Sequence, residues 1–152
     1  MTPDRAVMWG DLVVVRPAGW IFTGGKDLLC TCRDESTFKM KLQRVNSRVR
    51  TPQQFQSSQE GIAMRRSRFL RLREMTGLDG PVLMYEMTEP HTDRCVIVFF
   101  AFTGGGEVRA DLSGPDLTDL QLQVFADAGR IVGSLHKFIF IRDAPKLPPT
   151  GA

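Results

Sequence analysis

The feature that most constrains the fold of this chain is the run 95–102, in which all eight residues are apolar. A strand with one face in water alternates apolar and polar side chains, whereas a strand covered on both faces is apolar throughout. The run is also far shorter than the roughly 20 residues that a membrane-spanning helix needs. We therefore expect it to form a central strand of a sheet with packed layers on both faces, and we expect no membrane insertion.

Six other segments have the composition of strands, and motifs rich in glycine or proline separate several of them. The clearest is 37–44, whose apolar side chains at the even positions alternate with polar ones that include Lys39 and Lys41. This alternation predicts a half-buried antiparallel strand with one face in water. The other five predicted strands are 12–15, 28–33, 68–75, 82–88 and 107–112.

Two segments predict helices. Thr51 and Gln54 have the spacing of a capping box, with a proline between them at the first helical position, so we expect a helix over 51–66. Gly61 in this segment either weakens the helix or marks a close contact. A second helix is expected over 117–138, where apolar residues recur at spacings of three and four.

The resulting order, β-β-β-α-β-β-β-β-α, predicts an α+β fold. Consecutive strands joined by hairpins favour a mainly antiparallel sheet of six to seven strands, with the two helices packed on it. A chain of 152 residues fits one domain, which we expect over residues 1–144. The proline-rich segment 145–152 is expected to be a flexible tail.

The few residues suited to chemistry do not form a recognisable site. Cys30 and Cys32 would share one face of a strand, but structural zinc needs four ligands, and only His91 and His136 could assist. We therefore expect buried thiols, no metal, no cofactor and no catalytic residue, so the chain is not expected to be an enzyme. Three cysteines and the lack of a secretory signal indicate the cytoplasm.

Charge is distributed unevenly along the chain. Residues 36–73 contain ten basic residues and one acid, and residues 74–128 contain ten acids and two basic residues. The arginine-rich stretch 65–73 is the most basic part. In one interpretation, which we favour, its arginines pair across the sheet with acids such as Glu86 and Glu107.

In the other interpretation, Arg71 and Arg73 form a positive platform together with Lys39 and Lys41. Such a platform would attract nucleic acid, phosphate or an acidic protein. Nucleic acid is the least favoured of these, because Phe69 is the only aromatic residue within the stretch and single-strand binders stack bases on aromatic rings.

The order of motifs resembles a known superfamily. Pro17-x-Gly19-Trp20 follows a short strand, Leu78-Asp79-Gly80-Pro81 separates two strands, and Ser134-Leu135-x-x-Phe138 closes the last helix. Over roughly residues 12–138 this progression is similar to the PsbP/Mog/DcrB-like superfamily, in particular to effector-associated (Eag) chaperones of type VI secretion. The resemblance implies a sandwich of sheet and helices without catalytic activity. It also implies a partner, which in that superfamily is a small GTPase, a photosystem or the hydrophobic segments of a secreted effector.

The function we expect is an intracellular protein-binding module of the adaptor or chaperone kind. Its partner would be a secreted effector or an acidic protein, and a homodimer is its expected assembly. The candidate partner-binding residues are Lys39, Lys41, Arg71, Arg73, Met40 and Met84. The alternative is a small-molecule-binding or enzymatic domain, with a pocket lined by Trp20, Tyr85 and Phe99 and with Arg71, Arg73 or His91 as its polar contact.

Overall fold

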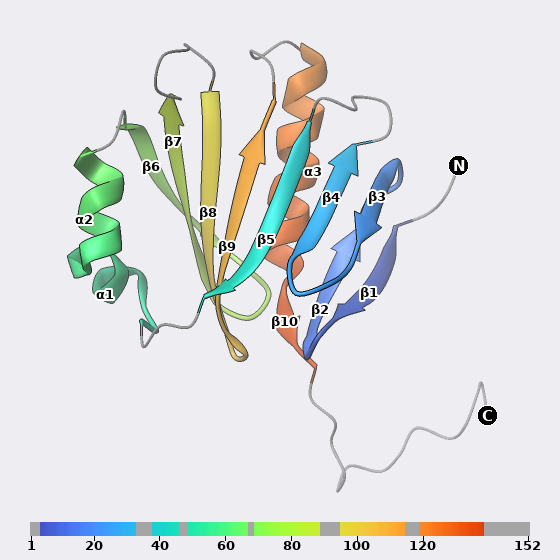
Figure 1. Ribbon diagram of the computed structural model, residues 1–152, viewed down its shortest axis with the longest axis horizontal. Helices are drawn as coiled ribbons and strands as arrows, with labels where there is room; N and C mark the ends of the chain where they lie inside the picture. The colour runs from blue at the N-terminus through green and yellow to red at the C-terminus, as the bar shows by residue number, and fades with distance from the viewer. Residues whose placement is uncertain are drawn as a thin grey trace, which may run out of the picture.

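The computed structural model describes residues 4–32, 38–45, 49–66, 69–88, 95–114 and 119–138. Along the chain these residues form strands, then two short helices, then strands, then a long helix and a final short strand (Figure 1). The elements are β1 (Arg5–Trp9), β2 (Leu12–Arg16), β3 (Trp20–Thr23), β4 (Leu28–Cys32), β5 (Lys39–Val45), α1 (Pro52–Ser57), α2 (Gln59–Arg66), β6 (Phe69–Thr76), β7 (Pro81–Thr88), β8 (Cys95–Thr103), β9 (Gly106–Ser113), α3 (Asp119–Ser134) and β10 (His136–Lys137).

Seven of the strands form one antiparallel sheet in the order β3-β4-β5-β9-β8-β7-β6. A smaller sheet has the order β1-β2-β10. The α+β class and the mainly antiparallel sheet of seven strands are confirmed. The predicted tail 145–152 lies outside the described residues.

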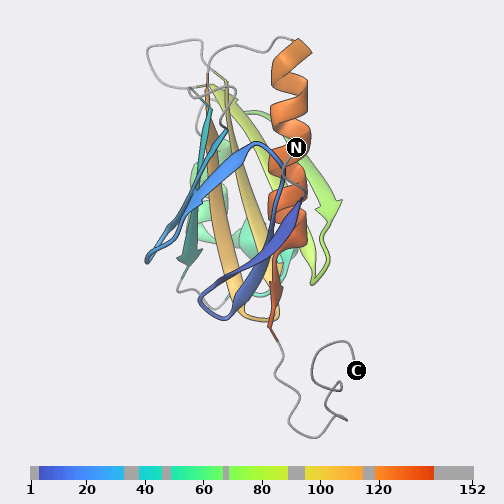
Figure 2. The same cartoon turned by 90° about the vertical axis from the view of Figure 1, so that its right-hand side faces the viewer.

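Side chains from the two faces of the large sheet enter two separate cores. On one face, which we call the α3 face, Phe99 and Ala101 of β8 pack with α3 and the small sheet. On the other, the α1 face, Phe100 and Phe102 pack with Phe55 of α1. Figure 2 shows α3 along one side of the sheet and the two short helices on the other. The prediction that the apolar run is covered on both faces is therefore confirmed.

The helix predicted over 51–66 is interrupted at Ser58. The capping by Thr51 is present, because its Oγ1 accepts a hydrogen bond from the Gln54 N–H at 3.1 Å. Ser58 then takes an extended conformation and starts a second helix, since its Oγ accepts from the Gly61 N–H at 3.1 Å. A second serine with N-capping geometry thus divides one predicted helix into α1 and α2.

The last helix also differs from its prediction over 117–138, of which 117–118 lie outside the described residues. It ends at Ser134, where the Leu135 N–H bonds to the carbonyl of Val132, and β10 follows as a third strand of the small sheet. Strands β1, β3 and β10 were not predicted, and β2, which was predicted over 12–15, belongs to the small sheet. No helix of the described residues is long and apolar enough to span a bilayer.

Candidate functional site

An open surface groove lies between α3 and the end of the β6–β7 hairpin. Its volume is about 790 Å³, and most of its lining side chains are apolar. We call it the α3–β6 groove. It is lined by Val15, Met75, Thr76, Gly77, Leu78, Met84, Phe99, Phe125, Ala126, Gly129, Arg130, Gly133 and Ser134.

Small residues of α3 leave room for the groove. Ala126, Gly129 and Gly133 recur at helical spacing along its groove-facing side. A Cβ at Gly129 would make only an ordinary contact with the Met75 side chain at 3.8 Å, and at Gly133 it would meet no described atom within 4 Å. Neither glycine has a positive φ angle. Each glycine lowers helix stability relative to alanine, and neither backbone conformation requires a glycine. Their effect is to leave this side of α3 without side chains, which makes room for the groove.

The large sheet supplies the floor, and the loop between β6 and β7 supplies one wall. Met84 and Phe99 lie on the α3 face of the sheet beneath the groove. Leu78 in the loop is 70% exposed, although its N–H donates to the Gly133 carbonyl at 2.7 Å. The carboxylate of Asp79 anchors the same loop by accepting from the Gly104 N–H at 2.7 Å. An apolar side chain is therefore held in water at the mouth of an apolar groove.

Two of the three polar side chains of the groove, Arg130 and Ser134, already take part in the fold. Arg130 forms ion pairs with Asp4 and with Asp127, the second at 3.5 Å. The hydroxyl of Ser134 accepts from the Val15 N–H at 2.8 Å and donates to a carbonyl within α3. The surface left to a ligand is consequently mainly apolar.

Two of the predicted residues, Arg71 and Arg73, lie beside this groove. Their side chains share the α3 face with Glu86, since β6 pairs with β7 in the register Arg71–Glu86 and Arg73–Met84. The Glu86 carboxylate lies 3.3 Å from Arg71 and 4.0 Å from Arg73. The predicted pairing with Glu86 is confirmed. Glu107 points to the α1 face and therefore does not pair with Arg71 or Arg73.

The predicted platform of four basic residues is not formed. Lys39 and Lys41 lie on β5, on the α1 face, whereas Arg71 and Arg73 lie on the α3 face of β6. Strands β9, β8 and β7 separate them. Lys41 pairs instead with Asp27 at 3.5 Å. The alternation of each strand was correct, but the order of strands, which decides which side chains meet, could not be derived from alternation.

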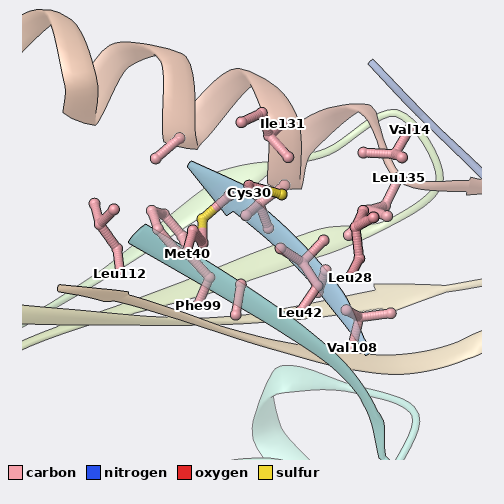
Figure 3. Close-up of a cluster of buried hydrophobic side chains, with 14 of the residues drawn as sticks. Val14, Leu28, Cys30, Met40, Leu42, Phe99, Val108, Leu112, Ile131 and Leu135 are labelled. Atoms are coloured by element: carbon pink, nitrogen blue, oxygen red, sulfur yellow. The ribbon is translucent and has the colours of Figure 1, made fainter. Parts of the chain in front are cut away.

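The two methionines of the prediction have different environments. Met40 is only 1% exposed and packs beside Cys30 and Leu112 beneath α3, as Figure 3 shows, so it cannot contact a partner. Met84 lines the α3–β6 groove together with Met75. The interpretation of Met40 as a partner-binding residue is therefore wrong, whereas Met84 stays a prediction that its position suits.

The alternative pocket of Trp20, Tyr85 and Phe99 does not exist. Tyr85 is fully buried in the core of the α1 face, whereas Trp20 and Phe99 belong to the other core. The indole N–H of Trp20 donates to the Asp127 carboxylate at 3.0 Å, which joins β3 to α3. His91, the proposed polar contact, lies outside the described residues.

No metal centre is evident in the part of the chain that the structure describes, which holds no group of three or more suitable ligands. Cys30 and Cys32 are buried free thiols. Burial raises the pKa of the Cys30 thiol to about 12, because the thiolate would lose its hydration. His136 lies outside the groove, with Nδ1 2.9 Å from the Ser134 carbonyl.

Of the residues that line the groove, the sequence analysis named only Met84 and Phe99 as candidates, and it missed those of α3 and of the β6–β7 loop. Gly129 and Gly133, four positions apart in a predicted helix, were the available signal, because glycines are costly inside a helix. Leu78 gave no signal of its own, since its exposure depends on where the β6–β7 loop meets α3.

Comparison with known proteins supports the fold alone. The chain is similar to the solution structure of cyanobacterial PsbP (CyanoP) from Synechocystis sp. PCC 6803, with a TM-score of 0.58 over 90% of this chain and 94% of that one. Sequence identity is 10%. No family model and no curated protein matches the sequence. The chain therefore has a PsbP-like fold, as the resemblance predicted.

Proposed function

We propose that this chain is a non-enzymatic protein-binding module, of the adaptor or chaperone kind, that holds an apolar segment of a partner protein in the α3–β6 groove. The observation that carries the proposal is the groove itself. It is open, about 790 Å³ in volume and lined mainly by apolar side chains. Removing such a surface from water stabilises a complex in proportion to the apolar area that is covered.

The chemistry of the lining favours a protein segment over a reacting substrate. Met75 and Met84 are flexible and polarisable, which suits surfaces that must adapt to different side chains. Two of the three polar side chains of the groove are engaged within the fold, Arg130 by two carboxylates and Ser134 by two backbone groups. The lining residues are therefore suited to bind a partner through apolar contact.

Two buried free thiols, Cys30 and Cys32, support a reducing compartment, so we place the module in the cytoplasm. A chaperone that shields apolar segments before secretion would work there. An apolar segment held in the groove would be kept from aggregating until it is passed on.

The test is to fill the groove without disturbing the fold. Gly133→Leu adds a side chain where a Cβ has open space, and leucine is a better helix former than glycine. Gly24→Leu is the matched control, because a Cβ there also meets no described atom within 4 Å and the residue lies far from the groove between β3 and β4.

Tagged wild type and both variants would be purified from native cells, and the proteins retained with each would be quantified by mass spectrometry. We expect one stoichiometric partner with wild type and Gly24→Leu and its loss with Gly133→Leu, while thermal unfolding shows all three to be folded. A partner that binds Gly133→Leu as tightly as wild type would show that the groove is not the binding site.

A further inference from the structure

Strand β6 forms one edge of the large sheet and borders the α3–β6 groove. It has eight residues, whereas β3 at the opposite edge has four. Figure 2 shows the end of β6 beside α3. No strand of the described residues pairs with its outer edge. Alternate N–H and C=O groups of an edge strand point outward, and a long edge can accept a further strand.

The pairing of β6 with β7 is regular in the part of β6 that lies beside the groove. The register with β7 shifts between Phe69 and Arg71, and from Arg71 to Thr76 it is continuous. These six residues span about 20 Å at the usual rise of a strand. The irregularity thus lies at the far end, and the segment beside the groove has the geometry that an added strand requires.

The side chains of this segment on the α3 face are Arg71, Arg73 and Met75, in alternate positions. Met75 lines the groove. An added strand places its own side chains opposite these at the same period of two. Its residues would therefore face two guanidinium groups and then an apolar position that continues into the groove.

The charge at this edge favours acidic side chains in the partner. Arg71 and Arg73 share the single carboxylate of Glu86, which leaves one unit of positive charge among the three groups. The side chains of both arginines are more than half exposed, at 55% and 52%. Arg130, the nearby arginine of α3, is already paired with two carboxylates.

A second copy of this chain fits the edge poorly in the registers that pair most of β6. In a symmetric antiparallel pairing centred on residue 72, Arg71 of each copy would lie opposite Arg73 of the other. Centring the pairing on residue 73 would place the two Arg73 side chains opposite each other. Centring it on residue 74 would place the two Glu74 side chains opposite each other. Like charges directly opposite each other destabilise a strand pair.

We infer that β6 accepts an extended segment of the partner protein as an added strand, with acidic side chains opposite Arg71 and Arg73 and an apolar side chain entering the α3–β6 groove beyond Met75. This inference rests on the proposed function and names the conformation and chemistry of the partner segment. Main-chain hydrogen bonds would supply affinity, and the alternating side chains would supply specificity.

The experiment selects peptides as long as β6 from a random display library on the immobilised full chain. The tightest peptide is then synthesised with a fluorescent label, and two further versions carry N-methyl groups on the odd-numbered or on the even-numbered backbone nitrogens. Arg71→Glu/Arg73→Glu reverses the charge of the edge. Arg71→Gln/Arg73→Gln removes this charge, and it replaces the first variant if repulsion from Glu86 unfolds that variant. Lys39→Glu/Lys41→Glu is the matched control, because it reverses two alternate charges on β5 at the opposite face.

We expect selected peptides with Asp or Glu at alternate positions, no binding by one of the two N-methylated registers, and affinity that falls as salt rises. Binding should weaken by about tenfold or more in the arginine variants and be unchanged in the lysine control. A peptide with lysines in place of its acids should bind Arg71→Glu/Arg73→Glu again.

Peptides without alternating acids, or indifferent to both N-methyl registers, would overturn the added strand. If such peptides still failed to bind the Gly133→Leu variant, the groove would remain the binding site and only the conformation of its occupant would differ. Failure to select any peptide, with a partner still captured through the groove, would likewise overturn the strand and leave the proposed function standing.

Discussion

A Cβ at Gly61 would lie 2.0 Å from the carbonyl oxygen of Phe55, which is closer than two such atoms can approach. The contact arises because α2 turns back on α1 directly after Ser58. Phe55 in turn packs on the sheet, with its ring centroid 4.2 Å from that of Phe100. The close approach of the two helices is therefore part of what closes the core of the α1 face.

Gly61→Ala should destabilise the protein. The atom that the new methyl group meets belongs to the backbone, so the two helices must separate to relieve the overlap. Overpacking of this kind costs about 1–3 kcal/mol. Urea denaturation followed by circular dichroism should show a lower midpoint with an unchanged slope, and an unchanged midpoint would mean that the helices adjust without loss.

Gly133→Ala should have the opposite effect. A Cβ there has open space, and alanine is better than glycine by at most about 1 kcal/mol, the helix-interior value, because Gly133 lies in the last turn of α3. For a domain of this size, the upper limit corresponds to a rise in the melting temperature of about 2–4 °C. Calorimetry of the two alanine variants together gives the comparison, and a lower melting temperature for Gly133→Ala would mean that the glycine serves the fold.

The two glycines show what the sequence could and could not establish. Gly61 was expected to mark either weakness or a close contact, and the structure selects the close contact. The choice depends on the interruption at Ser58, which a helical pattern of apolar residues does not reveal. In general, periodicity identified the elements well, because burial of one face is a local property of each segment.

The candidate site depended on relationships that no segment contains by itself. Alternation correctly separated Lys39 and Lys41 from Met40, and Arg71 and Arg73 from the residues between them. Which strands are neighbours was decided by the crossover that places β5 against β9 and leaves β6 at the edge. The groove itself arises where α3 crosses the end of β6, and that crossing has no counterpart in local sequence.

The Cys30 thiol should be inert in the folded protein. Burial raises its pKa to about 12, so almost none of it is thiolate near neutral pH. A thiol reagent that absorbs on reaction should therefore titrate the same number of groups in native wild type and in native Cys30→Ser. In denaturant, the variant should react with one equivalent fewer. A lower count for native Cys30→Ser would show that the site opens readily.

The ion pair between Asp11 and Arg44 should contribute to stability only above a low pH. The hydrogen bond from Arg44, which also donates to the Gly105 carbonyl, lowers the pKa of the Asp11 carboxyl below its ordinary value of 3.8. Because the folded pKa lies below the unfolded one, the stabilisation is present above pH 3.8 and is lost as the pH falls through the folded pKa. The contribution should be small, since both groups are largely in water.

Arg44→Gln should therefore raise the pKa of Asp11 toward 3.8, which a nuclear magnetic resonance titration of the side-chain carboxyl measures directly. Lys41→Gln is the matched control, because it removes the same charge from the same strand but its partner is Asp27. The loss of stability in Arg44→Gln should be larger near neutral pH than below the folded pKa of Asp11, where only the hydrogen bond to the Gly105 carbonyl is lost. An Asp11 titration that is the same in Arg44→Gln as in wild type would assign the lowered pKa to the turn between β1 and β2 rather than to the ion pair.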